Sequence, residues 1–126
     1  MAFQFFNPNP YGTYVGDCVI RALCKALDCT WYKIYAELAI EGYIMGDMPS
    51  SNRVWGKYLK SSGFKRYVIP NTCPDCYTIK DFCADYPKGT YIVGTGTHVV
   101  CVKDGKYYDS WDSGDEVPMF FFKKEA

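Results

Sequence analysis

The chain of 126 residues has room for one domain with a single hydrophobic core. Its 48% hydrophobic, 18% aromatic and 22% charged residues are typical of a folded globular protein and exclude a disordered or fibrous one. Lys plus Arg and Asp plus Glu number 14 each, so no broad positive field favours nucleic acid or a membrane surface as a partner, although a local patch is compatible with this balance.

The N-terminal segment lacks the features of a targeting sequence. Residues 1–6 carry no basic run, and Asn7 and Pro8 interrupt their short apolar stretch. No segment approaches the roughly 18 apolar residues of a membrane span. The seven cysteines are odd in number and fall mostly in apolar periodic segments, so we expect reduced thiols. These features predict a soluble, cytoplasmic protein.

Three helices are expected in the first half of the chain, after an irregular lead-in over residues 3–16 that is rich in Asn, Pro, Gly and Tyr. Each begins at a residue whose side chain can accept a hydrogen bond from the first turn. The expected helices are residues 18–27 after Asp17, residues 30 to about 40 from Thr30, and residues 50 or 51 to about 62 from Ser50 or Ser51. Gly42 and Gly63 are expected to end the second and third.

Strands dominate the second half, where apolar residues alternate with polar ones or form short continuous runs. A short helix from Thr78 to residue 85 interrupts them. The expected strands are residues 65–69, 90–94, 98–103, 106–109 and 117–123. Asp104 and Gly105 are a strong signal for a two-residue hairpin. Helices followed by a mainly antiparallel sheet indicate a single α+β domain over residues 1–126.

His98 is the only histidine in the chain and begins the apolar strand over residues 98–103. A lone histidine at such a place is more often structural than catalytic. The hairpin at residues 104–105, however, returns the chain so that Asp109 lies close to the start of the His98 strand. A carboxylate there would fix the tautomer and orientation of the imidazole. Asp112 lies in the following loop, and we expect it to matter little.

Cys18 lies in the first turn of the helix over residues 18–27. Unpaired backbone N–H groups and the helix dipole favour an anion there, which lowers a thiol pKa and makes thiolate available. The alternative interpretation is a small buried residue at the start of a core helix. The negative charge of Asp17 opposes ionisation of the neighbouring thiol, so an imidazolium partner has to outweigh it.

In combination, these positions resemble the papain-like cysteine protease superfamily. The nucleophile of that family opens the central helix in a Gly-x-Cys run, which residues 16–18 (Gly-Asp-Cys) match. Its histidine begins a strand of small apolar residues, as in residues 98–102 (His-Val-Val-Cys-Val). An Asn-Ser-Trp sequence follows a hairpin in the family, and residues 109–111 (Asp-Ser-Trp) are similar to it with Asp in place of Asn.

The resemblance implies a role for each of these residues. Cys18 is then the nucleophile, His98 the general base and Asp109 the orienting group, with Trp111 shielding the contact between the last two. The implied fold has N-terminal helices, including a central helix that starts at the nucleophile, packed on a C-terminal antiparallel sheet. Because the related proteases carry asparagine as the orienting residue, the resemblance also implies that Asp109→Asn keeps substantial activity.

The oxyanion hole departs from the family pattern. The family usually places a glutamine six residues before the cysteine, and that position here is Gly12. Gln4, Asn7 or Asn9 are the candidates to replace it, together with the backbone N–H of Cys18.

Cys73 and Cys76 form a Cys-x-x-Cys pair that is compatible with half a zinc site or a redox pair. A tetrahedral zinc site needs two further ligands, and the single histidine is assigned elsewhere. A redox motif would close a βαβ unit, whereas this pair follows a proline-containing loop. The favoured interpretation is a loop with two thiols, and no metal or other cofactor is expected.

The leading functional hypothesis is a cysteine peptidase, a thiol-dependent hydrolase that cleaves a peptide, isopeptide or related amide of a peptide or protein substrate through a thioester. An amidase or acyltransferase with the same triad on a non-peptide substrate is the close alternative. A papain-like binding module with weak or no turnover is the third, because the glutamine is missing and Asp17 adjoins the thiol.

Overall fold

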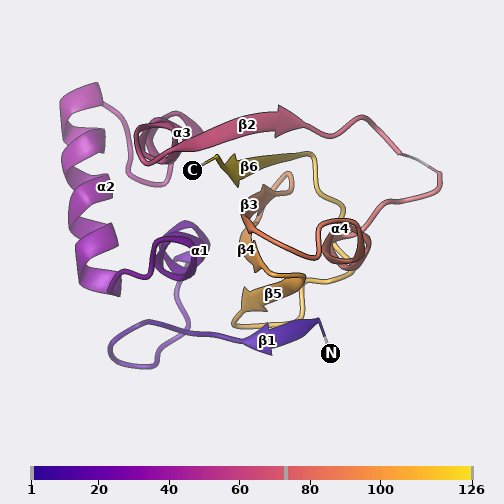
Figure 1. The fold of residues 1–126 in the computed structure, drawn as a ribbon. Coiled ribbons are helices and arrows are strands. Elements are labelled where there is room, and N and C mark those ends of the chain that lie inside the picture. Colours follow the sequence, from indigo (N-terminus) through magenta and orange to yellow (C-terminus); the bar gives the residue numbers. More distant parts are fainter. Residues whose placement is uncertain (1, 73, 126) are drawn as a thin grey trace.

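The computed structural model describes residues 2–72 and 74–125 and confirms the expected α+β class. In this part of the chain, six strands form one sheet, with three helices on one face and one helix on the other (Figure 1). The helices are α1 (Cys18–Leu27), α2 (Trp31–Met45), α3 (Asn52–Ser61) and α4 (Ile79–Asp85). The strands are β1 (Phe3–Phe5), β2 (Phe64–Val68), β3 (Thr90–Gly94), β4 (Val99–Lys103), β5 (Lys106–Asp109) and β6 (Phe120–Lys124).

Helix α1 spans the residues predicted for it, but Asp17 does not cap it in the way that the sequence predicted. Asp17 occupies the N-cap position and makes no capping hydrogen bond with its side chain. Its carboxylate accepts hydrogen bonds from the guanidinium of Arg21 at 2.7 Å and from the indole N–H of Trp31 at 2.9 Å. The Asp17 carboxylate, which the sequence predicts to cap the helix, therefore binds the buried Arg21 guanidinium instead.

Helix α2 begins as predicted, since the Thr30 hydroxyl accepts the backbone N–H of Lys33 at 3.2 Å. The prediction that Gly42 ends it is wrong: the helix continues to Met45, and Gly46, with φ of 68°, terminates it. Gly42 serves close packing instead, because a Cβ there would lie 2.6 Å from the carbonyl oxygen of Asp47. None of the described helices is both long and apolar enough to cross a membrane.

The sheet has the strand order β1-β5-β4-β3-β6-β2. All neighbours are antiparallel except β1 and β5, which pair in parallel at one edge. Strand β1 lies inside the segment for which the sequence predicted an irregular lead-in, so that prediction is wrong for residues 3–5. The central strand β6 starts at Phe120, three residues later than expected.

Alternating side chains of the central strands supply two hydrophobic cores. Ile92 of β3 and Cys101 of β4 face α1, α2 and α3, where Trp55 and Leu23 are fully buried. On the opposite face, the neighbouring strand residues pack with α4, largely through aromatic rings. Helix α1 packs against β4, β3 and β5. This packing brings the start of α1 to the ends of β4 and β5, where the candidate site lies.

Candidate active site

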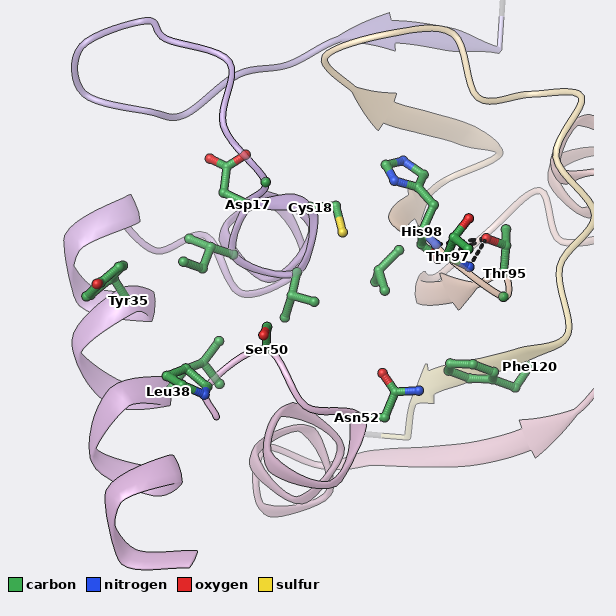
Figure 2. Close-up of a pocket in the computed structure, with 16 residues that line it drawn as sticks. Asp17, Cys18, Tyr35, Leu38, Ser50, Asn52, Thr95, Thr97, His98 and Phe120 are labelled. Atoms are coloured by element: carbon green, nitrogen blue, oxygen red, sulfur yellow. Dashed lines mark hydrogen bonds between the residues drawn. The ribbon is translucent and has the colours of Figure 1, made fainter. Parts of the chain in front are cut away.

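Cys18 is the first residue of α1, and its thiol faces a cavity shared with His98 at the start of β4 (Figure 2). The Cys18 side chain is partly buried and lies close enough to the His98 ring and to the backbone N–H of Val99 for both to lower the pKa of its thiol. The structure thus brings together two residues separated by most of the chain, and it adds a backbone donor that the sequence did not indicate.

The turn between β3 and β4 fixes the position of His98. The buried Thr95 hydroxyl accepts the backbone N–H groups of His98 at 2.9 Å and of Thr97 at 3.2 Å (Figure 2). The backbone N–H of Thr95 in turn donates to the His98 carbonyl at 2.8 Å. A threonine turn therefore holds the histidine backbone rigidly just before the strand begins.

Asp109, the last residue of β5, is fully buried, and its carboxylate makes three hydrogen bonds and one ion pair. One carboxylate oxygen lies 2.6 Å from Nε2 of His98 and accepts the Ser113 hydroxyl at 2.6 Å. The other accepts the Ser110 backbone N–H at 2.8 Å and lies 3.0 Å from the Arg21 guanidinium. Asp109 thereby reaches His98 as the hairpin register predicted, and Nδ1 of the imidazole is left for the thiol. Asp112 instead binds the Tyr107 hydroxyl and the Gly114 N–H.

Arg21 is the residue at this site that sequence reasoning missed. It is 5% exposed, and its guanidinium bridges the carboxylates of Asp17 and Asp109. Its spacing contained a signal, since a residue four positions after Asp17 and three after Cys18 lies on their side of a helix. The Asp17 charge was expected to oppose ionisation of the neighbouring Cys18 thiol. Its ion pair with Arg21 offsets that effect.

The electrostatics favour a thiolate and imidazolium pair. Burial raises the pKa of the Cys18 thiol, but the hydrogen bonds from His98 and Val99 outweigh it and bring the pKa below its ordinary value. Burial lowers the pKa of His98, and its contacts with Asp109 and Cys18 outweigh that and raise it to about 9. The pKa of Asp109 is held below its usual range against the effect of burial by His98 and Ser113. Of the two groups, the His98 imidazole therefore holds a proton more strongly than the Cys18 thiol.

The other buried thiols have the opposite environment. Burial raises the pKa of Cys24 to about 12, of Cys83 to about 11 and of Cys101 to about 12. Each lies among hydrocarbon without a cationic hydrogen-bond donor of the kind His98 provides. Cys18 is accordingly set apart from these three thiols by its electrostatics.

Trp111 lies against the imidazole, with ring centroids 4.8 Å apart and planes tilted by 44°. Its side chain remains 46% exposed, so it covers one side of His98 while facing solvent with the other. This placement fits the predicted shielding of the contact between His98 and Asp109.

Two cavities meet at Cys18 and His98. The first, of about 390 Å³, has an apolar floor that includes Leu38 and Phe120 and a neutral polar rim that includes Asn52 (Figure 2). The second, of about 490 Å³, lies on the other side, toward Tyr14, Val15, Ser110 and Trp111. A chain lying through both cavities would cross the thiol.

The three candidates for an oxyanion donor line neither cavity. Gln4 lies in β1, where its register partner is Tyr108. The Asn7 amide donates to the Thr13 carbonyl at 3.2 Å, and the Asn9 side chain accepts the Tyr11 N–H at 2.9 Å. The two asparagines therefore order the loop before α1. The backbone N–H of Cys18, the candidate nucleophile, remains the other candidate donor.

Within the described ranges 2–72 and 74–125, no three His, Cys, Asp or Glu side chains group as a metal ion would require. Cys76 is exposed, and its sequence partner Cys73 lies outside the described residues. Comparison of the chain with protein-family models, curated proteins and solved structures found no match.

Proposed function

We propose that the protein is a papain-like cysteine hydrolase that cleaves a peptide, isopeptide or related amide bond. The observation that carries the proposal is the placement of Cys18 and His98 in the same two cavities, with Nε2 of His98 2.6 Å from a carboxylate oxygen of the buried Asp109. A helix that begins at the nucleophile and packs on a sheet carrying the other two residues is the arrangement implied by the sequence resemblance.

The reaction follows from the protonation states. The Cys18 thiolate attacks the carbonyl carbon, a C–S bond forms, and the carbonyl oxygen takes the displaced electron pair. The backbone N–H of Cys18, at the positive end of α1, stabilises that oxyanion. When the tetrahedral species collapses, the C–N bond breaks and the leaving amine takes the proton from Nδ1 of His98. A thioester and a neutral imidazole remain.

Water completes the turnover. His98, now neutral, accepts a proton from a water molecule as the water oxygen attacks the thioester carbon, and the C–S bond then breaks. The products are a carboxylic acid and the Cys18 thiolate beside a protonated His98. Asp109 keeps Nε2 as a donor throughout, so that Nδ1 is the nitrogen that exchanges the proton. A reducing compartment such as the cytoplasm would keep the thiol available, and the six described cysteines are unpaired.

The first test is selective labelling of the native protein with iodoacetamide at pH 7, followed by peptide mapping. Cys18 is expected to react first, because its pKa is lowered while those of Cys24, Cys83 and Cys101 are raised. Exposed Cys76 is the internal reference for an ordinary accessible thiol. Labelling of Cys76 ahead of Cys18 would remove the basis of the nucleophile assignment.

The second test is acyl transfer from p-nitrophenyl acetate, read as p-nitrophenol release and as an acetyl group on Cys18 by mass spectrometry. Cys18→Ala and His98→Ala should abolish the acylation, and Cys83→Ala, a buried thiol on the opposite face, is the matched control. Acylation that survives Cys18→Ala would refute the thiol mechanism. A Cys18 thiol inert to both reagents would favour the binding-module alternative.

A further inference from the structure

A third cavity, of about 400 Å³, opens between α3, β2 and β6. Its lining contains four basic side chains and no acidic one: Arg53, Lys57, Lys60 and Arg66. The chain as a whole carries equal numbers of basic and acidic residues, so the charges are segregated at this cavity. A concave basic surface of this kind concentrates anionic groups from solution.

The basic cavity adjoins the catalytic one. Asn52 and Phe120 line both of them, so these two side chains form the boundary over which a bound chain would pass. The guanidinium of Arg66 lies 4.7 Å from the centroid of the Phe120 ring, which orients the cation beside that boundary. Figure 2 shows Asn52 and Phe120 on the side of the catalytic cavity toward α3 and β6.

Among the described residues, two of the four cations have no ion-pair partner. Arg53 lies 3.0 Å from Asp47, and Lys57 lies 3.5 Å from Glu41. Within the described residues, no ion pair joins Lys60 or Arg66 to a carboxylate. The side of the cavity formed by the end of α3 and the middle of β2 therefore presents two cations to an incoming anion.

We propose that this basic cavity binds acidic side chains, of aspartate or glutamate, in a polypeptide substrate whose scissile amide lies at Cys18. The inference rests on the proposed function for the position of that amide. A peptide is favoured over a nucleic acid for two reasons. The shared boundary connects the cavity to a groove whose other lining residues are neutral or paired, and the balanced net charge provides no extended field along which a polyanion would lie.

The test uses thiol-alkylating peptides in matched acidic and neutral forms. One pair carries Glu-Glu or Gln-Gln before an Ala-Gly chloromethyl ketone, and a second pair carries the same residues after an N-terminal bromoacetyl-glycine, so that both chain directions are sampled. Alkylation forms a bond between the Cys18 sulfur and the methylene carbon and releases the halide. Each rate is divided by the iodoacetamide rate of the same protein, which removes differences in thiol reactivity.

In at least one direction, the Glu-Glu reagent is expected to react about three- to tenfold faster than its Gln-Gln partner, the size expected for two exposed ion pairs. The ratio should fall to about one in Lys60→Gln/Arg66→Gln and at high salt. Lys33→Gln/Lys88→Gln, at exposed lysines outside the cavity, should keep it. If loss of Arg66 from the Phe120 ring impairs folding, Lys60→Glu alone should invert the preference. Equal rates in both directions, or a preference that survives the double variant, overturn the proposal.

Equilibrium binding separates this inference from the proposed function. Fluorescein-labelled Glu-Glu-Ala-Gly and Gln-Gln-Ala-Gly amides are titrated with Cys18→Ala, which cannot react, and anisotropy is recorded. Tighter binding of the acidic peptide, lost in the Lys60→Gln/Arg66→Gln background, supports the cavity even if Cys18 proves inert to iodoacetamide. Equal binding refutes it even if Cys18 is an active nucleophile. A single-stranded oligonucleotide that binds this cavity more tightly than the acidic peptide would also overturn the assignment.

Discussion

The two faces of the sheet bury different chemistry. On the α4 face, Phe82, Tyr86, Tyr91 and Phe121 contact one another with ring centroids 4.3 to 6.1 Å apart. On the α1 face, two carboxylates, one guanidinium and the imidazole are buried together at the end of the core. Aromatic contacts stabilise the fold through burial alone, whereas each buried charge incurs a desolvation cost that its partners have to offset.

The buried charges on the α1 face are not what stability alone would favour, because an apolar core like that of the α4 face avoids the desolvation cost. Among the described residues, no buried side-chain nitrogen or oxygen lacks a hydrogen-bond partner, so the charged cluster is fully satisfied. The thiols show the effect of the two environments: the pKa of Cys83 on the α4 face rises to about 11, while that of Cys18 falls. An environment that stabilises a thiolate is the expected mark of a reactive site.

The largest effect is expected from Asp109→Asn, and it reverses what the resemblance implies. All four accepting positions of the carboxylate face donors. The amide nitrogen of asparagine could take either of two places. In one it would face two donors, the Ser110 N–H and Arg21. In the other it would face His98 and Ser113, and it would then donate to Nε2 of His98 and impose the wrong imidazole tautomer. We expect the rate of Cys18 acylation to fall by about 10³- to 10⁴-fold in both Asp109→Asn and Asp109→Ala, measured with p-nitrophenyl acetate.

Asp112→Ala is the control for that prediction, because Asp112 binds Tyr107 and the Gly114 N–H rather than His98. It should keep the acylation rate within about a factor of three. If Asp109→Asn retained most of the rate, the tautomer argument would be wrong and acceptance by a single oxygen would suffice.

Arg21→Met tests the charged face against the aromatic one. Removing the guanidinium leaves Asp17 and Asp109 buried without their shared cation, which should lower the free energy of unfolding by about 3–5 kcal/mol. Phe82→Leu, in the centre of the aromatic cluster, replaces one ring with a somewhat smaller apolar side chain and should cost less, about 1–2 kcal/mol. Urea denaturation followed by tryptophan fluorescence measures both.

A second substitution sharpens the result. Asp17→Asn combined with Arg21→Met removes one of the two stranded charges, so the double variant should be more stable than the sum of the single effects predicts. Strict additivity would indicate that Arg21 stabilises the fold by packing rather than by its charge.

The smallest effect is a change in how stability depends on pH. Folding raises the pKa of His98 from its ordinary value of 6.5 and lowers that of Cys18 from its ordinary value of 9.0. Proton uptake by His98 on folding is therefore offset by proton loss from Cys18, which reduces the slope that the pair contributes. Cys18→Ala removes this compensation.

In Cys18→Ala, the Asp109 contact still raises the pKa of His98, so the folded state binds more protons than the unfolded state above pH 6.5. The stability from this contact is complete below pH 6.5 and is lost as the pH rises through the folded value. Relative to the unaltered protein, the variant should lose on the order of 1 kcal/mol between pH 6.5 and 9, measured by urea denaturation at each pH. Parallel curves for the two proteins would show that no proton moves from Cys18 to His98 on folding.

The sequence correctly predicted those features of the structure that depend on residues close together in the chain. The hairpin at Asp104 and Gly105 fixed the register that brings Asp109 to His98, and the apolar run after Asp17 marked α1 to the residue. The short helix α4 begins directly after Thr78 and ends at Asp85, as the sequence predicted. Each of these features depends on residues a few positions apart.

Long-range partners explain what was missed. Strand β1 exists because its backbone pairs in parallel with β5, a partner about a hundred residues away, and the N–H of Phe6 donates to the Asp109 carbonyl at 2.8 Å. The burial of Arg21 depends on two carboxylates, one of which follows it by 88 positions. No local pattern encodes such contacts.

The placement of the reactive residues also has a consequence for biosynthesis. Eighty positions separate Cys18 from His98, so at about 5–20 residues per second the ribosome delivers the histidine roughly 4–16 s after the cysteine. Until then Cys18 has neither His98 nor the Val99 N–H to stabilise a thiolate. The nascent segment consequently carries an ordinary thiol, and the lowered pKa of Cys18 arises only when the strands built from the later half of the chain close against α1.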